Sequence, residues 1–326
     1  MRVLVRLPNW LGDALMARPA LHALRRAHPA AEIRAVGPGA LLDLLAGDGV
    51  FDRGEAWSTV AAERAGVVRA LRAWRPTAAL VLPPSFSSAW LAWRSGAATR
   101  VGFAGEARSP LLTAALPRPA RGELHLSREY LLLAARLGGA PVAVPPLAPP
   151  ASGRGAAAAL RARVAPAGAR LALLAPGALY GPAKRWAPER FAGVARALAE
   201  RGFVVAVCGT AAERETCAAV AAAAHAVSLA GETDLATQAA LCAGSALALC
   251  NDSGLAHLAA ALGVPTVAVF GSTSSAWSAP LGARVRVVQR APVCAPCFRR
   301  TCRIGYRCLE AVGERAVLRA CLEAAA

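Results

Sequence analysis

Short, uniformly apolar runs recur along this chain, and most of them end in a glycine or an Asn-Asp pair. In the second half they occupy residues 170–177, 203–209, 247–252 and 266–271, with stretches of helical pattern between them. A run without apolar/polar alternation is typical of a strand buried on both faces, as in a parallel sheet covered by helices. The pattern therefore predicts an α/β fold with right-handed crossovers.

The first half repeats this rhythm. Its predicted strands are 3–7, 32–37, 78–83 and 99–103. Residues 139–155 then form the densest Pro/Gly stretch of the chain, and because proline is excluded from helix interiors and central strands, we expect an interdomain linker there. The sequence thus predicts two Rossmann-like, doubly wound domains, residues 1–150 and 151–326, the second ending in a terminal helix.

The charge balance favours anionic partners. Among 326 residues, 37 are basic and 20 acidic, a formal net charge of +17. Nucleic acid, phosphorylated small molecules and an anionic membrane face all match such an excess. Hydrophobic residues make up 56% of the chain, which excludes intrinsic disorder. No uninterrupted apolar run is long enough for a membrane span, and the N-terminal MRVLVRLPNW reads as a strand rather than a signal peptide, so we expect a cytoplasmic protein.

One basic residue differs from all the others. Lys184 is the only lysine among the 37 basic residues, and the remaining 36 are arginines. A lone lysine indicates a need for a compact ammonium, although chance is the alternative explanation. It lies in the Gly/Pro-rich loop PGALYGPAKRW (176–186), at the carboxyl end of a predicted strand, where doubly wound sheets bind ligands. Such a loop can wrap a diphosphate; the alternative is a solvated loop without a ligand.

A second candidate phosphate-binding motif lies at the end of the predicted strand 247–252. It reads Asn251-Asp252-Ser253-Gly254, and His257 lies one turn into the next helix. The backbone N–H groups of Ser253 and Gly254 are expected at the positive end of that helix, which favours phosphate oxygens. Alternatively, Asp252 only caps the helix and His257 is a packed helix residue.

Acidic residues follow two other strands. The first strand leads into Asn9-Trp10-Leu11-Gly12-Asp13. Here Gly12 permits a tight turn, and we place Asp13 at the N-cap of a helix over 13–26, with simple capping as the alternative to a chemical role. Glu232, after the short strand 226–229, is a candidate acceptor for ribose hydroxyls. Neither loop carries a GxGxxG or Walker motif.

Four of the nine cysteines lie close together in the sequence. They are Cys294, Cys297, Cys302 and Cys308, with the spacing C-x2-C-x4-C-x5-C. This spacing is compatible with a structural Zn²⁺ ion or a small Fe–S cluster, and a thiol-rich loop without a ligand is the alternative. Four earlier cysteines, at 208, 217, 242 and 250, fall in predicted strands and helices, where they are expected to be small buried hydrophobes.

Four separated motifs recur in the order typical of one family. They are LPNWLGDALMARPALHALRRAHP (7–29), the PGALYGPAKRW loop, LAGET (229–233) and NDSGLAHLAAALGVPTVAVFG (251–271). Together they resemble the ADP-heptose:lipopolysaccharide heptosyltransferases of glycosyltransferase family 9, most closely the type II members, from residue 1 to about 290. The resemblance implies a GT-B fold with two Rossmann-like domains facing a central cleft, the first binding the acceptor and the second the nucleotide sugar.

The resemblance also implies a reaction. It is the inverting transfer of L-glycero-D-manno-heptose from ADP-heptose to the heptosyl-Kdo-lipid A inner core of lipopolysaccharide, with no metal or cofactor required for catalysis. The chain contains no Asp-x-Asp motif, which agrees with a metal-independent donor site.

The same resemblance assigns roles to individual residues. Asp13 matches the candidate general base, Lys184 the donor-phosphate lysine and Glu232 the donor-nucleoside contact. Asp252 and His257 match the acidic residue and histidine of the donor site. In this reading Ser253 and Gly254 face the phosphates, and Asn9, Trp10 and Gly12 belong to a possible acceptor loop.

Partners and alternatives follow from these implications. A phosphorylated lipid acceptor at the inner face of the plasma membrane predicts peripheral contact between this basic chain and anionic lipid. A second interpretation, a family 9 transferase that uses another acceptor or sugar, remains open, because the sequence of loops such as 83–110 does not indicate which acceptor they bind. A four-cysteine, metal-containing nucleic-acid-binding protein is the third interpretation. It leaves the two α/β domains unexplained, and aromatic residues are only 5% of the chain, so we expect no nucleic-acid partner.

Overall fold

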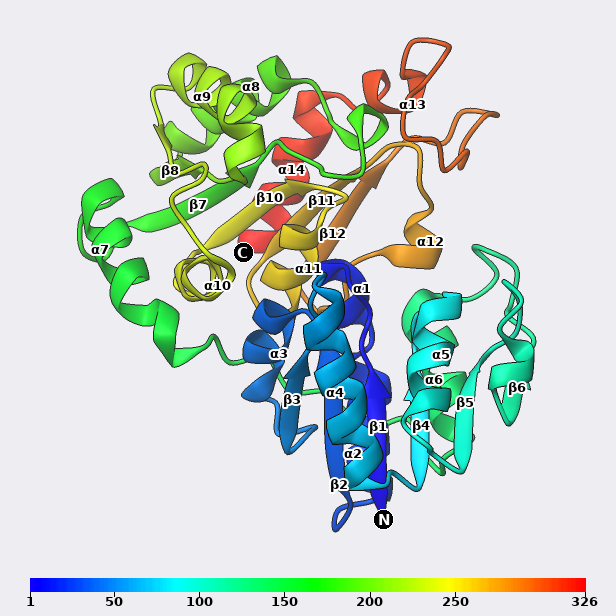
Figure 1. Cartoon of the computed structure of the whole chain (residues 1–326). Coiled ribbons are helices and arrows are strands. Elements are labelled where there is room, and N and C mark those ends of the chain that lie inside the picture. The colour runs from blue at the N-terminus through cyan, green and yellow to red at the C-terminus, as the bar shows by residue number, and fades with distance from the viewer. The chain divides into compact units, whose positions relative to one another are not determined.

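The computed structural model describes all 326 residues, which divide into two compact units, Met1–Leu147 and Ala148–Ala326 (Figure 1). Each unit contains one six-stranded sheet, with strand orders β3-β2-β1-β4-β5-β6 and β12-β11-β10-β7-β8-β9. Every strand pair is parallel. Counted within its own unit, each order is 3-2-1-4-5-6, the Rossmann arrangement. The predicted α/β class with two doubly wound sheets is confirmed.

The first unit alternates strands and helices along its length. Its strands are β1 (Arg2–Arg6), β2 (Glu32–Gly37), β3 (Arg53–Ala56), β4 (Ala78–Val81), β5 (Thr99–Phe103) and β6 (Ala114–Leu116). Its helices are α1 (Leu11–Met16), α2 (Arg18–Ala27), α3 (Gly39–Ala46), α4 (Ala61–Trp74), α5 (Phe86–Arg94) and α6 (Leu126–Ala135). The buried Arg18 connects α2 to the last residues of the unit. Its guanidinium pairs with Asp48 at 2.6 Å and donates to the Pro145 carbonyl at 2.8 Å.

The second unit has the same alternation. Its strands are β7 (Arg170–Ala175), β8 (Phe203–Val207), β9 (Val227–Ser228), β10 (Leu247–Asn251), β11 (Thr266–Phe270) and β12 (Val285–Gln289). Its helices are α7 (Arg154–Val164), α8 (Pro188–Ala199), α9 (Arg214–Ala223), α10 (Leu235–Ala243), α11 (Gly254–Ala261), α12 (Ser275–Ser278), α13 (Arg307–Glu310) and α14 (Glu314–Ala325). The final helix α14, red in Figure 1, packs across β10 and β11.

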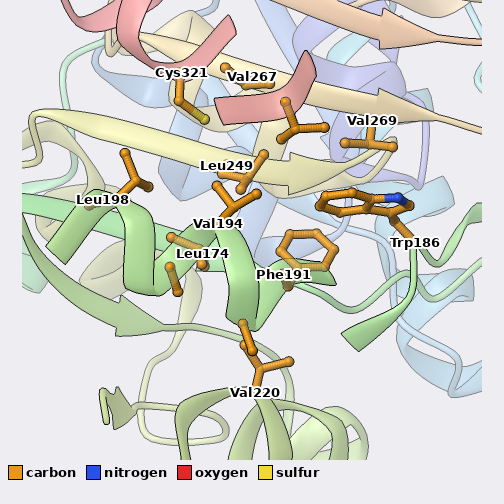
Figure 2. Packing of buried hydrophobic residues seen from close by; sticks show 14 of the residues in the cluster. Leu174, Trp186, Phe191, Val194, Leu198, Val220, Leu249, Val267, Val269 and Cys321 are labelled. Carbon is orange, nitrogen blue, oxygen red and sulfur yellow. The ribbon is translucent and has the colours of Figure 1, made fainter. Parts of the chain in front are cut away.

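The sheet of the second unit is buried on both faces, as its uniformly apolar strands predict. Along β7, Ala172 and Leu174 enter one core with side chains of α8, α9 and α14, whereas Leu171 and Leu173 enter a second core with α7, α10 and α11. Figure 2 shows the first core around Trp186. The cysteines at 208, 217, 242 and 250 lie in these two cores, so their predicted role as buried hydrophobes is confirmed.

Several element boundaries differ from the sequence prediction. The helix expected over 13–26 is two helices, since Pro19 cannot continue α1 but fits the first turn of α2. The C-terminal part of the expected linker, 139–155, is helical: a 3₁₀ turn at Ala151–Gly153 leads directly into α7. Strands β3, β6 and β12 were not predicted. All three are edge strands with exposed residues. Strands β3 and β12 contain charged residues, and β6 has only three residues, so none shows the longer apolar run of the central strands.

No helix combines the length and the apolar character that crossing a bilayer would require.

Candidate active site

In a sheet of order 3-2-1-4-5-6, ligands bind beyond the carboxyl ends of the two central strands, where the chain reverses its direction of winding. In the second unit these strands are β7 and β10, which pair with each other. The loop after β7 contains Lys184, and the residues after β10 include Asp252 and Ser253. The topology alone therefore brings the two predicted phosphate motifs to one point.

A buried asparagine joins these two segments. Asn251, the last residue of β10, is fully buried; its side-chain Oδ1 accepts from the Trp186 backbone N–H at 3.0 Å, and its Nδ2 donates to the Pro176 carbonyl at 2.7 Å. The two ends of the 176–186 loop are thus held by one side chain. The Trp186 ring packs edge-on against Phe191 with centroids 5.2 Å apart, and its Nε1 donates to the Val312 carbonyl, which anchors the loop in the core (Figure 2).

The lone lysine forms a nearly buried ion pair. Lys184 Nζ lies 2.6 Å from Asp252 Oδ2, with side-chain exposures of 14% and 3%. The hydroxyl of Thr273, which follows β11, donates to the same carboxylate oxygen at 2.5 Å. Asp252 therefore holds the ammonium in a fixed position, and Thr273 orients Asp252.

The start of helix α11 has free hydrogen-bonding capacity. Ser253 is its N-cap residue, and the Ser253 hydroxyl is buried without a hydrogen-bond partner and forms no capping bond. Because a buried hydroxyl without a partner is costly, this site is prepared for an acceptor oxygen, and the positive end of the helix favours an anionic one. Gly254 begins the helix, and His257 is buried one turn further on. The alternative explanation, in which Asp252 only caps the helix, is wrong, because Ser253 is the N-cap residue.

The structure does not bring Glu232 into this cluster. Its carboxylate forms an ion pair with Arg163 at 2.6 Å, in which both side chains are exposed. Glu232 follows β9, which lies at the edge of the sheet, two strands away from β7. It shares the carboxyl edge of the sheet with Lys184 but contacts neither Lys184 nor Asp252.

In the first unit, Asp13 follows β1, one of the two central strands, as predicted. It is not the N-cap: helix α1 begins at Leu11 after the N-cap residue Trp10, so Asp13 is the third helical residue. The tight turn expected at Gly12 is also wrong, because Gly12 lies inside α1 and does not have a positive φ. An aspartate in the first turn is stabilised by the helix dipole.

The surroundings of Asp13 include helix α6, which packs against α1. Burial raises the pKa of the Tyr130 phenol on α6 well above its usual range, and the negative charge of Asp13 adds to that shift. One residue earlier, the fully buried Glu129 pairs with Arg118 at 2.8 Å. Asp13 therefore lies beside a helix whose own acidic side chain is neutralised by an arginine.

The possible acceptor loop has a rigid base and an exposed tip. Arg6, a buried residue of β1, donates to Asn9 Oδ1 at 2.7 Å, and burial lowers the pKa of Arg6 to about 10. Trp10 extends outward and is 56% exposed. An indole left in water next to a candidate catalytic residue is available for contact with an apolar partner.

The structure does not support the predicted metal site. No group of three or more His, Cys, Asp or Glu side chains is positioned to hold a metal ion. Cys294 and Cys297 are exposed, whereas Cys308 is buried in the hydrophobic core. Cys302 Sγ accepts the backbone N–H groups of Ile304 and Tyr306, and these bonds lower its thiol pKa.

Two residues of this site were missed in the sequence. The sequence motif includes Asn251 without assigning it a role, although a polar side chain at the end of an otherwise apolar strand is a recognisable signal. Thr273 follows β11 in the same way, after Gly271 and Ser272. Its contact with Asp252 joins positions 21 residues apart, and spacing alone does not reveal it.

Comparison with known proteins identifies the family of this chain. Residues 64–307 match the family described as Glycosyltransferase family 9 (heptosyltransferase). Lipopolysaccharide heptosyltransferase 2 of Salmonella typhimurium is 31% identical over 317 residues, which cover 89% of this chain and 88% of that protein.

Solved structures agree with the family match. The structure of Escherichia coli ADP-heptose lipopolysaccharide heptosyltransferase II has a TM-score of 0.84 and 28% identity, covering 100% of this chain and 98% of that one. A glycosyl transferase family 9 protein from Veillonella parvula has a TM-score of 0.86 at 22% identity, covering 99% and 97%, which shows a shared fold.

Proposed function

The chain belongs to glycosyltransferase family 9 and is a heptosyltransferase of lipopolysaccharide core synthesis, and we propose that it transfers L-glycero-D-manno-heptose from ADP-heptose to heptosyl-Kdo-lipid A with inversion. The observation that carries this proposal is the set of groups at the carboxyl ends of β7 and β10. There a fixed ammonium, a partnerless buried hydroxyl and a helix N-terminus lie on neighbouring segments.

The second unit supplies the donor site in this proposal. The diphosphate of ADP-heptose accepts hydrogen bonds from Lys184, from the Ser253 hydroxyl and from the first backbone N–H groups of α11. Negative charge that builds on the leaving diphosphate is stabilised by the same groups, which are in place before the reaction begins. Asp252 keeps Lys184 in position. Glu232 contacts the nucleoside, for which it leaves its exposed ion pair with Arg163.

The first unit supplies the base. Asp13 accepts the proton of the acceptor hydroxyl while that oxygen forms a bond to the anomeric carbon of the heptose. The bond between the anomeric carbon and the diphosphate oxygen breaks, and ADP leaves with the electron pair. Attack from the face opposite ADP inverts the configuration at the anomeric carbon.

The test is direct product identification. The protein is incubated with ADP-heptose and a series of truncated core acceptors, and the products are identified by mass. We expect an acceptor ending in heptosyl-Kdo to gain one heptose. Gain on a different acceptor would change the assigned core position, and no gain from ADP-heptose on any acceptor would refute the proposed donor.

Peripheral membrane contact belongs to the same proposal. Trp10 and Phe86, exposed by 56% and 48%, follow the neighbouring strands β1 and β4 on the same sheet edge as Asp13. Exposed aromatic side chains on a chain with a net charge of +17 fit an anionic lipid surface. Co-sedimentation with vesicles should increase with anionic lipid content and decrease with salt. Binding that is indifferent to anionic lipid would contradict this part.

A further inference from the structure

The cysteine-rich segment, residues 294–308, has no role in the function proposed above. It connects β12 to α13. Three consecutive residues of this segment form hydrogen bonds with the 176–186 loop and with the residues that follow β11, which belong to the proposed nucleotide-sugar site. The Phe298 N–H donates to the Ser272 carbonyl at 2.8 Å, and the Ser272 hydroxyl donates to the Arg299 carbonyl at 3.0 Å. The Ala183 N–H donates to the Arg300 carbonyl at 3.0 Å.

These bonds connect the segment to both sides of the central ion pair. Ser272 directly precedes Thr273, which donates to Asp252, and Ala183 directly precedes Lys184. The segment is therefore a structural part of the donor site.

The approach of Arg300 depends on a glycine. At Gly181, whose φ is +146°, a Cβ atom would lie 2.6 Å from the Arg300 carbonyl oxygen. A side chain at this position would therefore be strained and would collide with the segment. Tyr180 adds a further bond, because its hydroxyl donates to the Phe298 carbonyl at 2.5 Å.

The side chains of Arg300 and Lys184 both lie over the Tyr180 ring. The Arg300 Cζ atom is 5.5 Å from the centroid of the Tyr180 ring, and Lys184 Nζ is 4.8 Å from the same centroid. The two cations are thus at most about 10 Å apart, about one Debye length at 0.1 M salt. Arg300 is exposed, and its guanidinium forms neither an ion pair nor a hydrogen bond within the protein.

We propose that Arg300 is a second cation of the donor site and binds the diphosphate of the nucleotide sugar together with Lys184. The reason is the local charge balance. Asp252 neutralises Lys184, so the pair by itself offers a diphosphate almost no net positive charge. An unpaired guanidinium beside it supplies that charge, and its planar fork donates two parallel hydrogen bonds to phosphate oxygens.

This inference rests on the proposed ADP-sugar donor, and ADP binding measured by calorimetry tests both. For Arg300→Ala we expect ADP to bind about tenfold more weakly than to the wild type, as for the loss of a hydrogen bond to a charged group. Arg300→Lys should recover part of the affinity. The matched control is Arg303→Ala, which removes an exposed arginine of the same segment and should leave ADP affinity unchanged.

The fold should survive Arg300→Ala, because the backbone carbonyl of this residue makes the bond to Ala183. An unchanged melting temperature checks this, and adenosine, which has no phosphate, should bind equally to wild type and variant. ADP affinity within twofold of the wild type, or an equal loss for adenosine and ADP, would overturn the role of Arg300 and leave the donor assignment standing. A wild-type protein that does not bind ADP would instead refute the donor assignment, and the inference with it.

Discussion

The two units have the same strand order, yet the loops that follow their equivalent first strands differ. After β1, a short loop leads into the six-residue helix α1. The exposed Trp10 is its N-cap residue, and Asp13 lies in its first turn. After β7, an irregular loop runs to Trp186 and is fastened by Asn251, and its Lys184 is paired with a buried aspartate. One scaffold thus supports an open loop in the first unit and a tightly bonded loop in the second.

This difference matches the two substrates in the proposed reaction. A diphosphate needs charges and N–H groups that are in position before it arrives, and buried hydrogen bonds provide that rigidity. A lipid-linked acceptor is large and partly apolar, so a short helix with an exposed aromatic side chain suits it. In this proposal, the sheet topology sets where each substrate binds, and the loop after the first strand sets which substrate it is.

The largest effect, on turnover, is expected for Asp13 in helix α1, which follows β1. Asp13→Asn should lower turnover by about 100-fold or more, the usual range for loss of a general base, with ADP affinity unchanged. Turnover on ADP-heptose and calorimetric ADP binding measure the two quantities. Asp43→Asn, at an exposed position of α3, is the control and should be silent. Near-normal turnover of Asp13→Asn would leave Asp13 only a role in stabilising α1.

Loss of the ammonium in the bonded loop should affect binding as well as turnover. Lys184→Ala removes a charged hydrogen-bond donor, and roughly 10- to 100-fold weaker ADP binding is expected. It also leaves Asp252 buried without its partner, so the melting temperature should fall.

Lys184→Arg sharpens this test, because it keeps the charge but replaces the compact ammonium by a planar fork, and we expect only partial recovery of ADP affinity. Full affinity in this variant would make the single lysine of the chain a matter of chance.

The hydrogen bonds of Asn251 to both ends of the 176–186 loop predict an intermediate effect on the melting temperature. Asn251→Ala leaves the Trp186 N–H and the Pro176 carbonyl unpaired in the core, at a cost of about 2 kcal/mol. The melting temperature should fall by roughly 4–8 °C for a domain of this size. Asn9→Ala, in the loop that follows β1, removes an exposed side chain and should lower the melting temperature by less, because Arg6 keeps its hydrogen bond to the Val36 carbonyl. Equal shifts in the two variants would remove the contrast between the loops.

The smallest effect concerns the orientation of Asp252. Thr273→Val keeps the shape of the side chain but removes the hydroxyl that bonds Asp252, and ADP should bind about two- to fivefold more weakly. Thr77→Val removes a hydroxyl of the first unit that bonds only the Arg2 backbone, and it should have no effect on ADP affinity. If Thr273→Val left ADP affinity unchanged, Lys184 alone would position the Asp252 carboxylate.

The sequence predicted the central strands well and the edges poorly. Strands such as β7 and β10 are continuously apolar because helices cover both faces, and that pattern is visible locally. Strand β3, with the sequence RGEA, is exposed at a sheet edge and has no such pattern. Pro19 lies inside the helical pattern of residues 13–26, but the exact place of the break between α1 and α2 depends on how the two helices pack.

Most of the candidate site could be named from the sequence, but its contacts could not. Lys184 was identified by its rarity and Asp252 by its place after a strand, whereas the ion pair between them appears only when β7 and β10 lie side by side. Arg300 has no local signal in the sequence. Thr273 follows an apolar strand, but its bond to Asp252 is visible only in the folded chain.

Hydrophobic periodicity and turn chemistry are local properties, so the sequence predicts two doubly wound sheets with polar residues at the carboxyl ends of their strands. Which of those residues meet depends on how the folded chain packs, and in the fold Glu232 forms an exposed pair with Arg163, away from Lys184. The fold also leaves the four neighbouring thiols without a common metal-binding geometry and bonds their segment to the donor loops. The physical reason is that hydrogen bonds and ion pairs act over a few ångströms, and chain packing sets those distances between residues far apart in sequence.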